Sequence, residues 1–281
     1  AATSQPAATE QPVSPPAVTR HNAAVEDAIA IVGMSGIMPQ SPDLATFWQQ
    51  LAAGKSMISE VPAERWDWRA YDDDPDHPQP WLQWGGFIPD VDKFDPLFFK
   101  ISPSEAEMMD PQHRLFLQCV WQCIEDAGYR AADLAGRQIG VYAGVQFQEY
   151  QALIIHETGE PNTLMGTGTA HAMIANRVSY LLDLHGPSEA IDTACSSALV
   201  ALHRAARAIR SGEIEGALVG GVSLALSPVT HVVTGKMGIL AADVKCRTFD
   251  QAAAGYVKGE GVGVVLLKPL RQAQADGDHI Y

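Results

Sequence analysis

The sequence has few cysteines and no long apolar run, and each absence excludes a class of protein. Its four cysteines are scattered over 281 residues, and the first residues lack the charged and then apolar pattern of a secretory leader. Free thiols in a reducing compartment therefore fit better than a disulfide framework. No apolar run approaches the roughly 18 residues that a membrane-spanning helix needs. We expect a cytoplasmic protein that does not enter a membrane.

Basic residues are also scarce, whereas apolar residues are plentiful. Lys and Arg number 19 against 33 Asp and Glu, a net charge of −14, which argues against nucleic acid or anionic lipid as a partner. Hydrophobic residues make up 47% of the chain, enough for a sizeable core. Residues 1–24 are rich in Pro, Ala, Ser and Thr, a composition that stays extended. We expect a linker over 1–24 and a folded domain over 25–281.

Apolar runs and amphipathic stretches alternate along the rest of the chain. Short apolar runs predict buried strands at 28–32, 138–145, 188–193, 216–222 and 261–267. Helical periodicity predicts helices at 43–53, 104–126, 169–184 and 195–211. A turn is expected at 33–36, and the Trp-, Asp- and Pro-rich residues 62–103 are expected to form an ordered insertion without regular elements. This order predicts an α/β fold with helices on both faces of a central sheet.

The most distinctive local feature is a strand that passes through small residues directly into a helix. In Ile191-Asp192-Thr193-Ala194-Cys195-Ser196-Ser197-Ala198, the sulfur of Cys195 is expected at a helix N-terminus, where the helix dipole favours a thiolate nucleophile. On the residues alone, a small buried cysteine is an equally open interpretation. Cys119 and Cys123, four apart on one helix face, predict core packing, and Cys246 in a predicted loop has no assigned role.

Several ordered segments make a family resemblance visible. The stretch DTACSSALVALHRA at 192–205 resembles the active-site signature of the β-ketoacyl synthases. The segments at 28–51 (AIAIVGMSGIMPQSPDLATFWQQL), 109–129 (MDPQHRLFLQCVWQCIEDAGY), 166–197 and 249–268 are similar to other parts of polyketide ketosynthase domains. The segments ERWDW and WGGFI look most like ketosynthases of modular assembly lines that are served by a separate acyltransferase.

This resemblance implies a fold, a reaction and partners. The fold would be thiolase-type, a layered helix and sheet architecture, with this chain forming its N-terminal half plus long inserted loops. Cys195 would take an acyl chain from the phosphopantetheine thiol of an acyl carrier protein. The resulting thioester would then be attacked by a carbanion from the decarboxylation of a malonyl unit, in a Claisen condensation. No cofactor would bind the chain directly. The resemblance also implies a homodimer, with the strand before Cys195 near the two-fold axis, and neighbouring assembly-line domains.

The chain departs from the family pattern at its catalytic histidines. In the family these lie in two motifs downstream of the GYVKGEG segment, and neither motif occurs before Tyr281. We therefore expect residues 25–281 to be the N-terminal portion of a ketosynthase domain, truncated before those motifs and inactive alone. His171 and His203 are expected to be helix residues without a catalytic role. Ala198 stands where the family pattern suggests a third serine.

Other interpretations remain open at this point. Glycines at 33–36, 166–168 and 259–263 suggest a dinucleotide-binding loop. However, the first group lacks the third glycine of the fingerprint, and the last group precedes a strand rather than a helix. The acidic run 72–77 could hold a metal, although a solvated loop explains it. A stripe of Arg204, Arg207 and Arg210 could contact an acyl carrier, or pair internally. A ketosynthase-like domain that binds acyl carrier protein or dimerises without catalysis is the alternative function.

Overall fold

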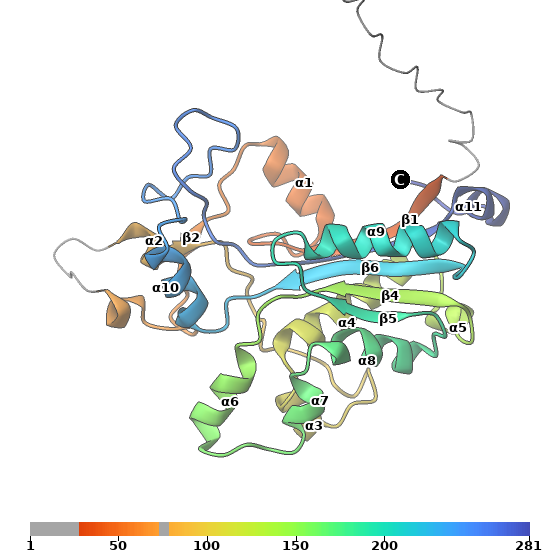
Figure 1. The fold of residues 1–281 in the computed structure, drawn as a ribbon, viewed down its shortest axis with the longest axis horizontal. Coiled ribbons are helices and arrows are strands. Elements are labelled where there is room, and N and C mark those ends of the chain that lie inside the picture. Colours follow the sequence, from red (N-terminus) through yellow and green to blue (C-terminus); the bar gives the residue numbers. More distant parts are fainter. Residues whose placement is uncertain (1–27, 73–78) are drawn as a thin grey trace, which may run out of the picture.

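A five-stranded mixed sheet forms the centre of the molecule (Figure 1). The computed structural model describes residues 28–72 and 79–281, so the expected linker at 1–24 lies outside the described residues. The strand order is β1-β7-β6-β4-β5, with β4, β5 and β6 parallel and β7 antiparallel to both β1 and β6. The strands span Ile29–Ile37 (β1), Ile139–Gly144 (β4), Ser188–Ile191 (β5), Gly216–Ser223 (β6) and Gly261–Pro269 (β7). All five strands expected from the sequence are present.

Helices cover both faces of this sheet, as the alternation of elements predicted. Helix α9 (Ser197–Arg210) contacts β4 and β6 from one side, and α4 (Pro111–Asp126) and α8 (Ala172–Leu182) cover the other. Strand β4 contributes side chains to the apolar clusters on both sides of the sheet, because successive side chains of a strand point to opposite faces. Tyr142 belongs to the apolar cluster under α9, whereas Val141 belongs to the larger cluster under α4. The result is a three-layer helix, sheet and helix arrangement.

The remaining elements are shorter and lie around these layers. Residues 62–103 are mostly irregular, as expected, but contain a 3-10 helix at Trp68–Tyr71 and the short elements α2 (Pro80–Gln83) and β3 (Trp84–Gly85), with β3 paired to β2 (Ser59–Glu60). The other helices are α1 (Leu44–Ala52), α3 (Pro103–Glu107), α5 (Ala131–Leu134), α6 (Tyr150–Thr158), α7 (Met165–Gly168), α10 (Pro228–Lys236) and α11 (Leu270–Asp276). None of the helices in the described ranges combines the length and apolar character that crossing a membrane takes.

Two local predictions were wrong. The expected turn at 33–36 is instead the middle of β1, which continues to Ile37. Gly33 is needed there because a Cβ would lie 2.5 Å from the carbonyl oxygen of Cys123 on α4. The single helix expected at 104–126 is two helices, α3 and α4, separated at Asp110. Pro111 cannot continue a helix but suits its first turn, and the Asp110 carboxylate caps α4 by accepting from the Gln112 N–H at 2.8 Å.

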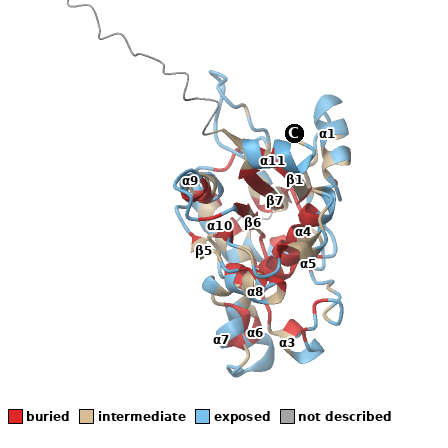
Figure 2. Cartoon of the chain, turned by 90° about the vertical axis from the view of Figure 1, so that its right-hand side faces the viewer, coloured by how far each residue is buried: buried red, intermediate tan, exposed pale blue. Residues whose placement is uncertain are grey.

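Buried residues concentrate between the layers, on the strands and on α4 (Figure 2). Eleven of the sixteen residues of α4 are buried, against five of the fourteen residues of α9. One large apolar cluster lies on the α4 side of the sheet, and a smaller one lies under α9. Fewer residues are therefore buried on the α9 side of the sheet than on the α4 side, and the α9 side is the one that carries the turn with Cys195.

Candidate active site

Cys195 lies at the tip of a short turn between β5 and α9. The carboxylate of Asp192 accepts the N–H of Ala194 at 2.9 Å, and Ala194 has a φ of +56°. That left-handed conformation is uncommon for a residue other than glycine, and here Ser197 supports it. The Ser197 hydroxyl donates to the Ala194 carbonyl at 2.7 Å and accepts from the Thr193 N–H at 2.9 Å. These contacts present Cys195 as an exposed thiol.

The helix that follows begins slightly later than the sequence predicted. Ser196 is the N-cap and Ser197 the first residue of α9, so Cys195 stands just before the helix rather than in its first turn. The start of α9 lies against two glycines of the parallel strands. A Cβ at Gly144 would be 2.7 Å from the backbone nitrogen of Ala198, and one at Gly221 would be 2.9 Å from the Ala198 Cβ. Small residues on β4, β6 and α9 thus position the turn.

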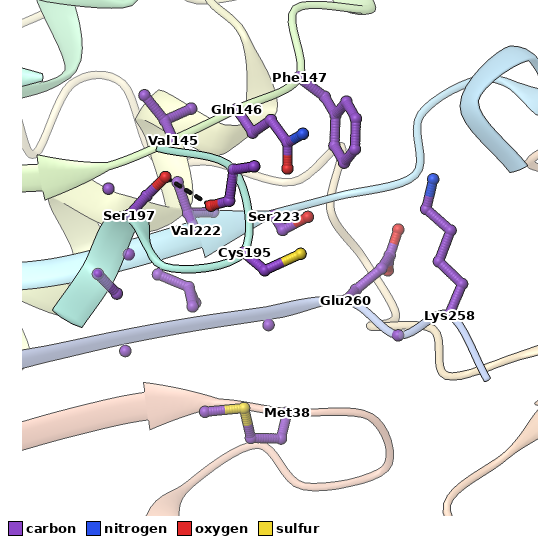
Figure 3. Close-up of a pocket in the computed structure, with 18 of the residues that line it drawn as sticks. Met38, Val145, Gln146, Phe147, Cys195, Ser197, Val222, Ser223, Lys258 and Glu260 are labelled. Atoms are coloured by element: carbon purple, nitrogen blue, oxygen red, sulfur yellow. Dashed lines mark hydrogen bonds between the residues drawn. The ribbon is translucent and has the colours of Figure 1, made fainter. Parts of the chain in front are cut away.

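A pocket of about 610 Å³ opens beside the thiol. It lies at the carboxyl ends of the parallel strands, the usual binding edge of such sheets. Its walls are residues 144–147 after β4, 221–223 at the end of β6, the turn around Cys195, the segment 256–263 leading into β7, and Met38. Figure 3 shows the sulfur of Cys195 pointing toward the segment that carries Lys258 and Glu260. Residues far apart in sequence therefore enclose one exposed thiol.

Lys258 is the cationic group in this wall. Its ammonium donates to the hydroxyl of Thr230 at 2.7 Å and lies 4.7 Å above the ring of Phe147. Burial lowers the pKa of Lys258, and the nearby carboxylates of Glu149 and Glu260 oppose that shift. Burial also raises the pKa of Tyr256, with a smaller contribution from Cys195. A hydroxyl and an ammonium thus share the pocket with the thiol.

A segment matching the model "Beta-ketoacyl synthase, N-terminal domain" covers residues 26–273. The chain belongs to the β-ketoacyl synthase family. It is 48% identical over 265 residues to polyketide synthase PksM of Bacillus subtilis, and 49% identical over 267 residues to polyketide synthase ThaG of Burkholderia thailandensis. Each match covers 92% of this chain but only 6% and 5% of those long proteins.

Solved structures agree with the family and establish the thiolase-type fold. The ketosynthase from module 6 of the bacillaene synthase of Bacillus subtilis matches with a TM-score of 0.81 and 43% identity. The oxazolomycin ketosynthase domain OzmH KS7 of Streptomyces albus matches with a TM-score of 0.82 and 44% identity. Both matches cover 90% of this chain, and 42% and 44% of those structures. The chain therefore spans less than half of the ketosynthase structures it resembles.

Of the other cysteines and histidines considered in the sequence, Cys119, Cys123 and His203 do not line the pocket, whereas His171 and Cys246 each contact a residue of its wall. Cys119 and Cys123 are buried in α4, as predicted, and burial raises the pKa of both thiols, that of Cys119 to about 11. His203 is exposed on α9. The Nε2 of His171 lies 3.4 Å from the carbonyl oxygen of Phe147, at the rim of the pocket wall. Cys246 is exposed, and its sulfur accepts the N–H of Val257 at 3.1 Å.

The structure bears on the dinucleotide and arginine-stripe interpretations, whereas most of the acidic run cannot be compared with it. The glycines at 33–36 lie within antiparallel β1, those at 166–168 fall in α7, and those at 259–263 lead into β7, so none forms a phosphate-binding turn before a long helix. Residues 73–78 of the acidic run lie outside the described residues. In the described part of the chain, no three His, Cys, Asp or Glu side chains gather as metal ligands. Arg204 pairs with Glu189 at 2.8 Å, in line with internal pairing.

The sequence analysis missed the ion pair behind the pocket wall. Arg65 and Glu260 form a two-pronged contact at 2.8 and 3.1 Å, with side chains 8% and 2% exposed. Arg65 also donates to the carbonyls of Ile88 and Ala225, and Glu260 accepts from the N–H groups of the same two residues. Both terminal nitrogens of the Arg65 guanidinium and both carboxylate oxygens of Glu260 are thus engaged. The pair joins the ERWDW and WGGFI segments to KGEG, three segments noted in the sequence only for their family resemblance.

A second missed contact supports the opposite wall. Gln112, in the MDPQHR segment, donates to the carbonyl of Phe147 at 2.7 Å and accepts from the N–H of Leu224 at 3.3 Å. Glu149 accepts from the N–H groups of Leu226 and Ser227, at 2.9 and 3.0 Å, where α10 begins. These buried polar residues connect the loops after β4 and β6. Gln112 precedes Leu115, Phe116 and Cys119 by three, four and seven residues, so a polar residue on the apolar face of the helical pattern is the sequence signal that could have marked it.

Proposed function

We propose that Cys195 is the acyl-accepting nucleophile of a polyketide ketosynthase. One observation carries the proposal, namely an exposed thiol held at the tip of a strand-turn-helix site inside a pocket. In the loading step, the Cys195 sulfur attacks the carbonyl carbon of an acyl thioester on the phosphopantetheine arm of an acyl carrier protein. A new carbon–sulfur bond forms, the bond to the pantetheine sulfur breaks, and that sulfur leaves as a thiolate that takes up a proton.

The condensation that follows completes the proposed reaction. A malonyl unit on a second carrier loses carbon dioxide, and the resulting carbanion attacks the Cys195 thioester, which releases the cysteine sulfur. The family resemblance gives two histidines a role in this step, and we propose that they lie in the part of the domain beyond residue 281. The residues of this chain serve the loading step: they hold the thiol, shape the pocket and supply N–H groups near the start of α9.

Acyl loading tests this proposal directly in the full-length protein. Incubation with an acyl pantetheine thioester is expected to add one acyl group to the wild type, detected by intact mass spectrometry. Cys195→Ala is expected to abolish the addition. Cys246→Ala removes the other exposed thiol and is the matched control, which should load normally. Acyl addition that persists in Cys195→Ala, or maps to Cys246, would refute the assignment and favour a domain that binds carriers without catalysis.

The proposed assembly is a homodimer formed along β5. This strand is the outermost of the sheet, and within the described residues β4 is its only partner strand. The helices that contact it, α8 and α9, carry the exposed apolar residues Tyr180 and Leu199. An unpaired strand edge with apolar neighbours favours association with a second copy. The acyl carrier protein, the neighbouring domains and a separate acyltransferase stay predictions from the family resemblance.

A further inference from the structure

The ion pair of Arg65 and Glu260 lies directly behind the pocket that contains Cys195. Glu260 is part of the pocket lining, while Arg65 reaches it from the insertion between α1 and α3. The backbone is fixed at the same place, because the N–H of Glu260 donates to the carbonyl of Gly86 at 2.8 Å and the N–H of Gly86 donates to the carbonyl of Lys258 at 2.9 Å. Arg65 therefore fixes the position of one wall of the pocket and compensates the charge of Glu260 in that wall.

The charge of this wall bears on the chemistry of the thiol. The titratable groups around Cys195 are Tyr256, Lys258 and Glu260 in the facing segment and Asp192 in its own turn, and the thiol of Cys246 contacts the facing segment at Val257. A thiolate and the oxyanion formed from a thioester are both negative, so a further uncompensated negative charge in the wall opposes both. Without Arg65, the Glu260 carboxylate would stand in the wall without its cationic partner, while it still accepts two backbone N–H groups.

We propose that Arg65 is a positioning residue for the chemistry of Cys195. It holds Glu260 in place and neutralises it, so that the pocket wall can be rigid and polar without opposing the formation of the thiolate. The insertion at 62–103 thus serves the site as well as the fold. This inference rests on the proposed function, because it assigns Arg65 to the same nucleophile.

A double-mutant cycle of Arg65 and Glu260 in the full-length protein tests the proposal. The measured quantity is the pH dependence of the rate at which iodoacetamide alkylates Cys195. Arg65→Met is expected to raise the midpoint of the pH–rate profile, and Glu260→Gln to lower it. A unit charge on the order of 10 Å away, at an effective dielectric constant of about 20, changes such a midpoint by about one pH unit. The double variant should return to the wild-type midpoint. Arg65→Lys, which keeps the charge but loses the two-pronged contact, should stay near it.

A second buried cation provides the matched control. Lys268 contacts Asp276 and Asp278 at the end of β7, and none of these three residues lines the pocket. Lys268→Met is expected to lower the melting temperature, as Arg65→Met does, but to leave the alkylation midpoint unchanged. Midpoints that stay at the wild-type value in both Arg65→Met and Glu260→Gln would overturn the proposal, as would shifts of the same sign in these two single variants.

The same measurements separate this inference from the proposed function. Alkylation requires only the thiol, whereas acyl loading requires that Cys195 react with a pantetheine thioester. Opposite midpoint shifts in a protein that does not accept an acyl group would support the role of Arg65 and contradict the proposed function. Normal acyl loading with unmoved midpoints would contradict the role of Arg65 alone.

Discussion

Helices α4 and α9 cover opposite faces of one sheet and place the same kinds of side chain in opposite environments. Helix α4 buries Cys119, Cys123 and His113. Helix α9 follows Cys195 and carries His203, and both of these residues are exposed. The thiols and imidazoles are chemically identical in the two places. Burial against the larger apolar cluster, rather than residue type, distinguishes the two sets.

The titration of groups on α4 shows what that burial does. Desolvation raises the pKa of Cys119 to about 11 and that of Asp110 to about 6, and lowers that of His113 to about 3. Every one of these shifts favours the neutral form, as expected when a charge must leave water. Cys195, in contrast, opens to a pocket with Lys258 in its wall. The comparison indicates that the thiols of α4 are structural, and it supports the proposal that Cys195, just before α9, is the reactive thiol.

The largest expected effect is in the rates at which the thiols react. In the native protein at pH 8, iodoacetamide should modify Cys195 at least about a hundred times faster than Cys119. The buried Cys119 thiol, with a pKa of about 11, is only about one part in a thousand ionised at that pH, roughly two hundred times less than an ordinary cysteine thiol of pKa about 8.5. Timed alkylation followed by peptide mass spectrometry measures this ratio. Unfolding in urea is the control and should bring the rates together. Similar native rates would contradict the comparison.

A smaller effect is expected from added methyl groups on the two faces. Gly144→Ala places a Cβ 2.7 Å from the nitrogen of Ala198, and Gly33→Ala places one 2.5 Å from the carbonyl oxygen of Cys123. Each should lower the free energy of unfolding by about 1–3 kcal/mol. Only Gly144→Ala should also slow alkylation of Cys195, because only that substitution displaces the start of α9.

Gly166→Ala is the control for these two substitutions. A Cβ at Gly166 meets nothing within 4 Å, so both the stability and the alkylation rate should stay near those of the wild type. Urea unfolding curves and timed alkylation supply the two measurements. Equal slowing of Cys195 by Gly33→Ala and Gly144→Ala would mean that the two faces are not independent.

The smallest expected effect is a pH dependence from His113. Its pKa is depressed in the folded protein from 6.5 to about 3, and neither ring nitrogen has a hydrogen-bond partner. As the pH falls below 6.5, the unfolded chain binds a proton that the folded protein excludes, so this residue lowers stability on acidification. His113→Leu should remove that loss. Its stability relative to the wild type should improve by about 1.4 kcal/mol for each pH unit below 6.5.

Asp110 adds a pH dependence of the opposite sign to the stability of the wild type. The difference in stability between His113→Leu and the wild type therefore reports on His113 more directly than the pH dependence of the wild type alone. The pKa of Asp110 is raised in the folded protein from 3.8 to about 6, so the folded state binds a proton first as the pH falls, and stability rises. The two groups act in opposite directions between about pH 6 and 4. Urea unfolding of both proteins at pH 7.5, 6 and 5 measures the difference. A difference that is constant with pH would show that the pKa of His113 is the same in the folded and unfolded states, which would contradict its depression by burial.

The sequence predicted the sheet, its covering helices and the turn that carries Cys195, because these depend on local patterns. Alternating apolar runs identified the strands, and small residues around Cys195 marked the turn. The failures at 33–36 and 104–126 have a common cause. Gly33 suggested a turn because glycine favours one, yet here it allows α4 to approach β1. In both cases a contact or cap between elements overrode the local signal.

The walls of the pocket could not be predicted in the same way. Arg65, Ile88, Ala225 and Glu260 meet only after the chain has folded. No period or spacing in the sequence connects them. The family resemblance located the segments that contain Arg65 and Glu260, but it did not show that these segments touch. Long-range polar contacts of this kind require the structure.

The position of β7 between β1 and β6 sets a condition on how the chain folds during synthesis. Strand β1 pairs only with β7 among the described strands, and Ile37 lies opposite Val262. At roughly 5–20 residues per second, β1 waits on the order of ten seconds or more after emerging from the ribosome before its partner exists. An apolar strand without a partner is open to aggregation. A slow, late closure of the sheet is therefore expected for this chain, and chaperones that shield β1 should raise its yield.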